Sequence, residues 1–276
     1  MGFPREAKAL ATGAGSGLGR AIACALAQRG AHVVGTDIRS SELDETGRLV
    51  QSAGGSWRGE LADAGSWDDW TRIHRGVLER EGAIDILVNN AGVAAVGPVG
   101  TIPMEDWRWL VDINLWGVIY GCHLFVPEMK ARGSGWILNV ASAAGIASAP
   151  EMGPYNVAKA GVISLTETLY GECTSLGVRT TVLCPTFFRS SLGDRTRTED
   201  DRLRSLTRKL IDRSDWSAEK VADLALEGLE AGRLYVLPQR DARIMMAARR
   251  VLGTSFQRWL AAYRERIERR IQRQLR

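Results

Sequence analysis

Short apolar segments alternate with longer stretches of helical length along most of this chain of 276 residues. A short apolar run fits a strand that is buried on both faces, and such strands occur in parallel sheets covered by helices. The expected strands are 7–12, 31–36, 56–60, 84–89, 135–141, 178–184 and 234–237, and the stretches of helical length include 18–29, 67–81, 107–131 and 155–176. The alternation predicts an α/β fold with a doubly wound parallel sheet in three layers. Such sheets bind ligands beyond the carboxyl ends of their strands.

The composition excludes several other classes of protein. Hydrophobic residues make up 45% of the chain and charged residues 25%, which is close to the globular average and excludes global disorder. The four cysteines form no C-x-x-C pair and the three histidines have no ligand spacing, so no metal site is predicted. Cysteines without a disulfide pattern favour a reducing, cytoplasmic location.

Positive charge is concentrated at the C-terminal end. Residues 240–276 hold eleven arginines against three acidic residues, a net charge of +8, whereas the first 239 residues carry −4. We therefore expect one domain over 1–239 and a basic helical tail over 240–276. Apolar residues recur every three or four positions over 244–275, which predicts a long amphipathic helix. Such a helix packs on the body or on a neighbouring subunit, or lies on an anionic membrane surface; nucleic acid is the third reading, with no accompanying fold signal.

A glycine-rich loop follows the first expected strand. Gly13, Gly17 and Gly19 have the spacing G-x-x-x-G-x-G, and a helix follows directly. Glycine lets the backbone approach a pyrophosphate closely, and the start of the helix offers free N–H groups and its positive dipole end. A tight turn without a ligand is the alternative, but the strand–loop–helix context favours dinucleotide binding.

Asp37 ends the second expected strand, eighteen residues after Gly19. A carboxylate at this position binds the hydroxyls of the adenosine ribose and repels a 2′-phosphate. The sequence therefore predicts NAD(H) in preference to NADP(H). Arg39 leaves NADP(H) open, because its guanidinium could partly neutralise a phosphate.

Tyr155 and Lys159 lie one helical turn apart, on one helix face. A phenol with a pKa near ~10 is a poor acid–base group at neutral pH, and a nearby ammonium stabilises the phenolate. Lowering the pKa by about three units takes roughly 4 kcal/mol of differential stabilisation. The pair can then act as general acid or base on an alcohol or carbonyl group.

Two further polar residues lie near this pair in the predicted fold. Ser142 ends an apolar strand, and its hydroxyl can steady charge on a substrate oxygen. Asn114 lies in an otherwise apolar helix. It is either a buried amide bonded to backbone or the holder of a water that links Lys159 to solvent.

Taken together, these residues resemble the short-chain dehydrogenase/reductase family, in its branch of about this chain length. The resemblance covers residues 7–237 and rests on the glycine loop, on Asn89-Asn90-Ala91-Gly92, on Asn114, Ser142, Tyr155-x-x-x-Lys159 and on Pro185. It implies a Rossmann-like sheet of seven parallel strands and direct hydride transfer with a nicotinamide dinucleotide. It also implies a catalytic tetrad of Asn114, Ser142, Tyr155 and Lys159.

The resemblance further implies a set of cofactor contacts. These are Gly13, Ser16, Gly17, Leu18, Gly19, Asp37, Ile38, Glu60, Leu61, Asn90, Ala91, Gly92, Tyr155, Lys159, Pro185, Phe188 and Ser190. The chain departs from the family pattern at three of the matched sites. Glu60 replaces the aspartate that meets adenine, Thr186 replaces a glycine after Pro185, and Ser190 replaces the threonine that bonds the carboxamide.

The long polar segment 186–216 predicts a mobile flap over the substrate, with short helices around 203–211. The expected substrate contacts are Ala94, Ser142, Met152, Tyr155, Phe187 and Leu192. Their apolar side chains favour a lipophilic substrate.

The sequence thus predicts an NAD-dependent oxidoreductase that acts on a secondary alcohol or its ketone, with Tyr155 as general acid or base. A catalytically silent dinucleotide-binding sensor or scaffold is one alternative, and an NADP-dependent 3-oxoacyl-type reductase is another. The resemblance also implies a homotetramer or homodimer.

Overall fold

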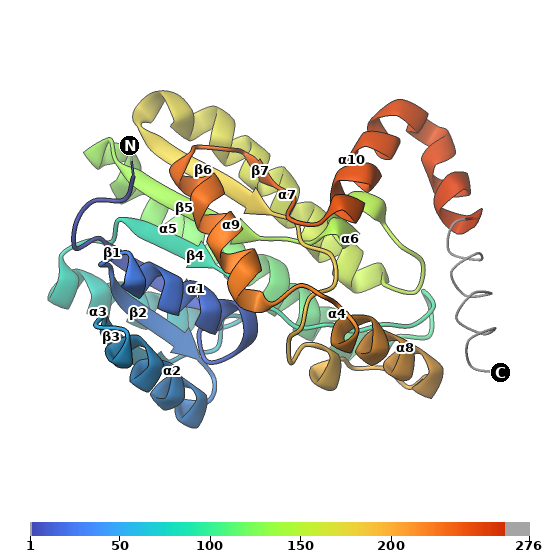
Figure 1. Ribbon diagram of the computed structural model, residues 1–276, viewed down its shortest axis with the longest axis horizontal. Coiled ribbons are helices and arrows are strands. Elements are labelled where there is room, and N and C mark those ends of the chain that lie inside the picture. The colour runs from blue at the N-terminus through green and yellow to red at the C-terminus, as the bar shows by residue number, and fades with distance from the viewer. Residues whose placement is uncertain (1, 263–276) are drawn as a thin grey trace.

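Seven parallel strands form one sheet in the computed structural model, which describes residues 2–262 (Figure 1). The strand order is β3-β2-β1-β4-β5-β6-β7, and every pair of neighbours is parallel. The strands are β1 Lys8–Thr12, β2 His32–Asp37, β3 Ser56–Leu61, β4 Ile86–Asn89, β5 Gly135–Val140, β6 Val178–Leu183 and β7 Tyr235–Val236. The order reverses between β1 and β4. The carboxyl ends of these two strands therefore flank the point where an open α/β sheet binds its ligand.

Helices cover both faces of the sheet, which makes three layers (Figure 1). Helices α1 and α9, with α2 beside α1, cover one face, and α3, α5 and α7 cover the other. The helices are α1 Gly17–Gln28, α2 Ser40–Ser52, α3 Trp67–Glu81, α4 Met104–Val111, α5 Gly117–Arg132, α6 Ala143–Ala147, α7 Gly153–Cys173, α8 Asp201–Asp212, α9 Ala218–Glu230 and α10 Arg240–Leu252. The predicted fold class is confirmed.

Burial explains why the central strands read as apolar runs. All residues of β4 and β5 are buried, because both faces of the sheet are covered. β3 lies at the edge of the sheet and all of its residues are exposed or half-buried, which explains its weaker strand pattern.

The helix expected over 107–131 is a composite. A π-helical turn, Asp112–Trp116, separates α4 from α5. The continuous stretch Met104–Arg132 is long and apolar enough to cross a membrane by length and composition. Here its inner face packs against the sheet through Phe125 and Met129, which are both 1% exposed. This is the pattern of a core helix.

The C-terminal prediction of one long helix is wrong within the described residues. α10 ends at Leu252, and the next residue, Gly253, adopts a φ of 50° that stops the helix. A 3₁₀ turn, Gly253–Ser255, follows, and a second helical stretch begins at Phe256. Residues 263–276 of the predicted tail lie outside the described residues.

The segment 186–216, predicted as a mobile flap, is hydrogen-bonded at its centre to the loop after β4. The backbone N–H of Arg197 donates to the carbonyl of Ala94, and that of Val96 donates to the carbonyl of Arg197. The Arg197 guanidinium also lies 3.6 Å from the centre of the Trp109 ring and pairs with Asp106 at 2.7 Å. The short helix expected in this segment is α8, one or two residues longer at each end than predicted.

Helices α6 and α7 touch through their backbones at Gly145. A Cβ atom at this position would lie 2.6 Å from the carbonyl carbon of Lys159 and 2.7 Å from its oxygen. We expect Gly145→Ala to lower the free energy of unfolding by about 1–3 kcal/mol, because backbone cannot move aside as a flexible side chain can. Chemical denaturation with urea measures the change.

Gly171→Ala is the matched control, since it also replaces a helical glycine. No atom lies within 4 Å of a Cβ at Gly171. This variant should be neutral, or more stable by up to about 1 kcal/mol from helix propensity. Equal stability of Gly145→Ala and wild type would contradict the close approach of α6 and α7.

Candidate active site

The carboxyl ends of β1 and β4 are joined by hydrogen bonds from one side chain. The Thr12 hydroxyl accepts from the backbone N–H groups of Asn90 and Ala91, each at 3.0 Å. The Asn90 amide returns a hydrogen bond to the Thr12 carbonyl at 2.8 Å. These contacts hold the loop after β4 beside the glycine loop after β1.

The glycine loop has a conformation that other residues adopt only with strain. Gly13 has a φ of +63° and Gly17 a φ of +53°, both in the left-handed region. A Cβ on Gly19 would lie 2.1 Å from the Gly13 carbonyl oxygen, so the loop can close onto α1 only with glycine there. A Cβ on Gly17 would meet only Ser190, at 3.8 Å, and would otherwise project into open space beside the loop.

A cleft of about 370 Å³ lies over these strand ends. The predicted cofactor and catalytic residues that line it are Gly13, Ser16, Gly17, Leu18, Gly19, Asp37, Ile38, Asn90, Ala91, Gly92, Tyr155, Lys159, Pro185, Phe188 and Ser190. Of the predicted substrate residues, Leu192 and Tyr155 line it. The fold therefore gathers side chains from residues 13 to 195 around one cavity.

Asp37 lies at one end of the cleft with both carboxylate oxygens bonded. Its Oδ2 accepts from the backbone N–H of Gly15 at 3.2 Å, and its Oδ1 accepts from the N–H and Nε of Arg39. The Ser16 hydroxyl accepts from Arg39 and from Arg195, each at 3.4 Å. Glu42 also pairs with Arg39 at 3.7 Å and with Arg195 at 4.0 Å, so two carboxylates and these two guanidinium groups meet here.

Lys159 is buried and Tyr155 is half-buried beside the cleft, and desolvation of their polar groups dominates their protonation. Burial raises the pKa of the Tyr155 phenol, and a hydrogen bond with the Ser142 side chain opposes part of that rise. Burial lowers the pKa of Lys159 to about 8. The Lys159 ammonium donates to the Val140 carbonyl at 2.9 Å and lies 5.8 Å from the centre of the Tyr155 ring.

The expected lowering of the Tyr155 pKa by Lys159 is therefore not what this structure shows. Desolvation penalises the phenolate more than the nearby groups stabilise it. At neutral pH the phenol keeps its proton, and it is prepared to donate that proton to an oxygen in the cleft.

Asn114 is a buried amide bonded to backbone. Its Oδ1 accepts from the Val93 N–H and its Nδ2 donates to the Val93 carbonyl, both at 2.8 Å. The π-helical turn carries this side chain, and its exposed fraction is zero. The amide therefore fixes the loop after β4 through both of its polar atoms.

Two predicted cofactor contacts, Glu60 and Leu61, do not line the cleft. The Glu60 carboxylate pairs with Arg58 and, at 3.0 Å, with Arg80 on α3. Leu61 is 52% exposed. Both lie on the edge strand β3, and the residues that follow it, Ala62–Ala64, line the cleft in their place.

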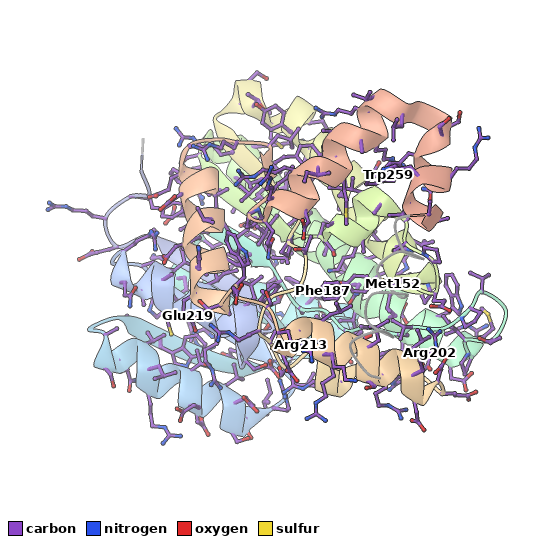
Figure 2. The ribbon with its side chains drawn as sticks, turned by 45° about the vertical axis from the view of Figure 1, so that its right-hand side comes forward. Met152, Phe187, Arg202, Arg213, Glu219 and Trp259 are labelled. Atoms are coloured by element: carbon purple, nitrogen blue, oxygen red, sulfur yellow. The ribbon has the colours of Figure 1, made fainter. Side chains whose placement is uncertain are left out.

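Four predicted substrate residues lie outside the cavity lining. Ala94 is buried, and its carbonyl accepts from the Arg197 N–H. Met152 forms an isolated β-bridge with Gly97. Phe187 is 41% exposed and lies between α8 and α10, with Met152 on the same side of the molecule (Figure 2). Ser142 contacts two residues of the lining, because its hydroxyl donates to the Pro185 carbonyl at 3.4 Å and interacts with the Tyr155 phenol.

Sequence reasoning missed Trp109, Ile113 and Arg195, which line the cleft. Trp109 and Ile113 share a face because they lie four residues apart in a helix that runs on to Asn114. This spacing was a usable signal. No sequence signal pointed to Arg195, because its approach to Ser16 depends on how the segment after β6 folds back.

The residues present fit a nicotinamide dinucleotide. The first N–H groups of α1 have no side-chain cap, and they face the cleft where a phosphate would gain from the helix dipole. The space beside Gly17 would be filled by a Cβ, and Asp37 offers a carboxylate at the end of β2. Among residues 2–262 no group of three or more His, Cys, Asp and Glu side chains gathers as a metal site would require.

Comparison with known proteins gives the family. The sequence model described as short chain dehydrogenase matches residues 7–201. The protein therefore belongs to the short-chain dehydrogenase/reductase family, whose members are oxidoreductases that bind nicotinamide dinucleotides.

Solved structures and relatives agree with this assignment. A short-chain dehydrogenase/reductase from Burkholderia phymatum in complex with NAD has a TM-score of 0.85 and 31% identity, covering 91% of this chain and 95% of that chain. A short-chain dehydrogenase from Sphingobium yanoikuyae in complex with NADPH has a TM-score of 0.76 and 25% identity, covering 89% and 94%. The 2-(R)-hydroxypropyl-CoM dehydrogenase of Xanthobacter autotrophicus is 34% identical over 184 residues, 64% of this chain and 72% of that protein.

Proposed function

We propose that the protein is an NAD-dependent oxidoreductase that interconverts a secondary alcohol and its ketone. The observation that carries this proposal is the meeting of Tyr155, Ser142 and Lys159 beside a cleft that fits a dinucleotide. When bound, the dinucleotide supplies the acceptor or donor of the hydride at the substrate carbon.

The side chains of the protein handle the proton of the reaction. In reduction, the Tyr155 phenol donates its proton to the carbonyl oxygen as that oxygen gains charge, and Ser142 bonds the phenol. In oxidation, the Tyr155 phenolate removes the proton of the alcohol while the C–H bond breaks. Because burial raises the pKa of Tyr155, the proton-donating form predominates at neutral pH, and the rate of oxidation should rise as the pH rises.

The walls of the cleft support a lipophilic substrate. Trp109, Ile113, Phe188 and Leu192 line it, and Val93 joins them from the loop after β4. The relative from Xanthobacter autotrophicus is named for a 2-hydroxypropyl group, which is a secondary alcohol. That name supports the reaction class, and the apolar walls support the chemical character of the substrate.

Tyr155→Phe should reduce turnover by roughly 100- to 10,000-fold, because it removes the acid–base group and keeps the ring. Dinucleotide affinity should stay within about twofold. Stopped-flow turnover with a panel of secondary alcohols and ketones, and titration of the dinucleotide, measure the two effects. Tyr170→Phe on the same helix is the control and should match wild type.

Undiminished turnover in Tyr155→Phe would remove the acid–base assignment. Dinucleotide binding by wild type without turnover on any alcohol or ketone would favour the catalytically silent sensor or scaffold instead.

The preference for NAD rests on Asp37. Its buried carboxylate lies where the adenosine ribose would bind and would repel a 2′-phosphate. Arg39 and Arg195 near Ser16 support the second candidate, an NADP-dependent reductase of the 3-oxoacyl type, because two guanidinium groups could hold a phosphate.

Asp37→Ala should weaken NAD binding by about 10-fold or more, the loss expected for hydrogen bonds to a charged group. The same variant should bind NADP more tightly than wild type does, because repulsion is lost and Arg39 and Arg195 remain. Isothermal titration with NAD and NADP checks both changes. Asp44→Ala, on the outer side of α2, is the control. Tighter binding of NADP than NAD by wild type would overturn the preference.

Two surfaces support partners beyond the substrate. Trp116 is 44% exposed and stacks on Tyr120, which also contacts the exposed Trp67. We propose that a second copy of this chain covers this aromatic surface in a homodimer or homotetramer. On α10, Ile244, Val251 and Leu252 are exposed on one side with arginines beside them, which supports peripheral contact with an anionic membrane by a cytoplasmic protein.

Sedimentation with and without anionic vesicles tests both surfaces. Trp116→Glu should lower the oligomer mass, because it places a charge in the covered surface, and should not alter vesicle binding. Val251→Glu should reduce vesicle binding at low salt and leave the oligomer intact. A monomeric wild type would overturn the first proposal. Equal vesicle binding by wild type and Val251→Glu would overturn the second.

A further inference from the structure

Ser142 belongs to a helix that is too short to stand alone. α6 has five residues, and its N-cap is Ser142, whose hydroxyl accepts from the Ala144 N–H at 3.1 Å. A helix of this length is not stable by itself, so its position must come from what packs around it. The Ser142 end of α6 is tied to the Pro185 carbonyl, which accepts from the Ala143 N–H at 2.9 Å and from the Ser142 hydroxyl at 3.4 Å. The place of the other end depends on the remaining neighbours of α6.

One neighbour is α7, and the other is the C-terminal part of the chain. α6 meets α7 at Gly145, as described above. On its other side lies α10, with the segment that follows α10 (Figure 1). Phe256 and Leu260 of that segment are buried against Ala147, the last residue of α6, and Trp259 packs at the edge of the same cluster. Figure 2 shows Trp259 between α10 and the segment that follows it.

Two side chains of this C-terminal part bond the free carbonyls at the end of α6. The guanidinium of Arg249 donates to the Ile146 carbonyl, and the Gln257 amide donates to the Ala147 carbonyl at 3.2 Å. The carbonyls at a helix end have no partner within the helix, so these donors satisfy groups that would otherwise need water. A positive charge at this end is also favourable to the helix dipole.

The chain continues from α6 in a conformation that needs such support. Ser148 follows directly with a φ of 54° in the left-handed region, and the segment then runs through Met152 to Tyr155. The segment 148–152 is thus fixed at both ends, at one by α7 itself and at the other by residues more than 100 positions away in sequence.

We propose that Arg249 and Gln257 are positioning residues for the reaction. They hold the C-terminal end of α6, and with it the start of the segment that leads to Tyr155, so that the Tyr155 phenol stays beside the Ser142 hydroxyl. The expected effect on turnover rests on the proposed function, whereas the positioning of α6 by Arg249 and Gln257 does not depend on it.

Arg249→Ala should lower kcat by about tenfold while the affinity for the dinucleotide stays unchanged, because the Ser142 contact weakens and the cofactor end of the cleft is untouched. The pH dependence of alcohol oxidation should move to higher pH, since the Ser142 hydrogen bond that lowers the pKa of Tyr155 is partly lost. Gln257→Ala should produce a smaller change in the same direction, and Arg249→Lys should recover part of the loss.

A double-mutant cycle separates positioning from general stability. In the Ser142→Ala background, Arg249→Ala should have little further effect on kcat, because the contact between Ser142 and Tyr155 that it maintains is absent. Arg258→Ala is the matched control, since Arg258 is exposed next to Gln257 and should leave kcat unchanged. Effects of Arg249→Ala and Ser142→Ala that simply multiply, or an unmoved pH profile, would overturn the proposal.

Hydrogen exchange of the protein without substrate keeps the two proposals distinguishable. Arg249→Ala should accelerate exchange in 143–148 and leave the centre of α7 protected. Faster exchange with no turnover in wild type would refute the proposed function and leave the positioning intact. Normal turnover with unchanged exchange and kcat in Arg249→Ala would refute the positioning.

Discussion

The parallel pairing of β1 with β4 is the constraint on which the site depends. It brings two loops, 13–19 and 90–92, to one edge of the sheet although more than 70 residues separate them. The Thr12 hydroxyl then joins the two loops through N–H groups that the sheet itself leaves unpaired. A strand order that reversed elsewhere would leave the glycine loop without an opposing wall, and no cleft would form there.

Desolvation of Lys159 and Tyr155 costs free energy, and the same desolvation determines the protonation of both groups. Lys159 is 3% exposed, and the lowering of its pKa shows that its charged form is disfavoured there. The same dry surroundings keep the Tyr155 phenol protonated. A surface Tyr–Lys pair would keep both groups near their ordinary pKa values, and water would screen their interaction. Both groups are therefore perturbed in opposite directions by one cause, which is typical of a functional site.

The sequence predicted what depends on local pattern and missed what depends on contacts distant along the chain. The strands follow from burial on two faces of the sheet, and the glycine loop follows from the positive φ of Gly17 and the close contact at Gly19. The sequence pattern therefore located the strands and the loop within a residue or two. Glu60 was assigned by its place in a motif, but its partner Arg80 belongs to the next helix, and that ion pair turns the carboxylate away from the cleft. The break at Gly253 was visible as a glycine, yet the apolar spacing on either side favoured one helix. The approach of Arg249 to Ile146 had no local signal at all.

Several donors from the end of the chain serve loops that follow other strands. The buried Gln239 side chain accepts from the Thr186 N–H at 3.1 Å and donates to the Phe187 carbonyl at 3.4 Å. Thr186 is one of the positions at which the chain departs from the family pattern. Arg243 donates to the carbonyls of Leu237 and Pro238, and Arg249 to that of Ile146. Loops beyond strand ends lack sheet partners for their carbonyls, and arginine reaches such groups from a distance. Part of the positive charge at the C-terminal end is therefore used inside the fold.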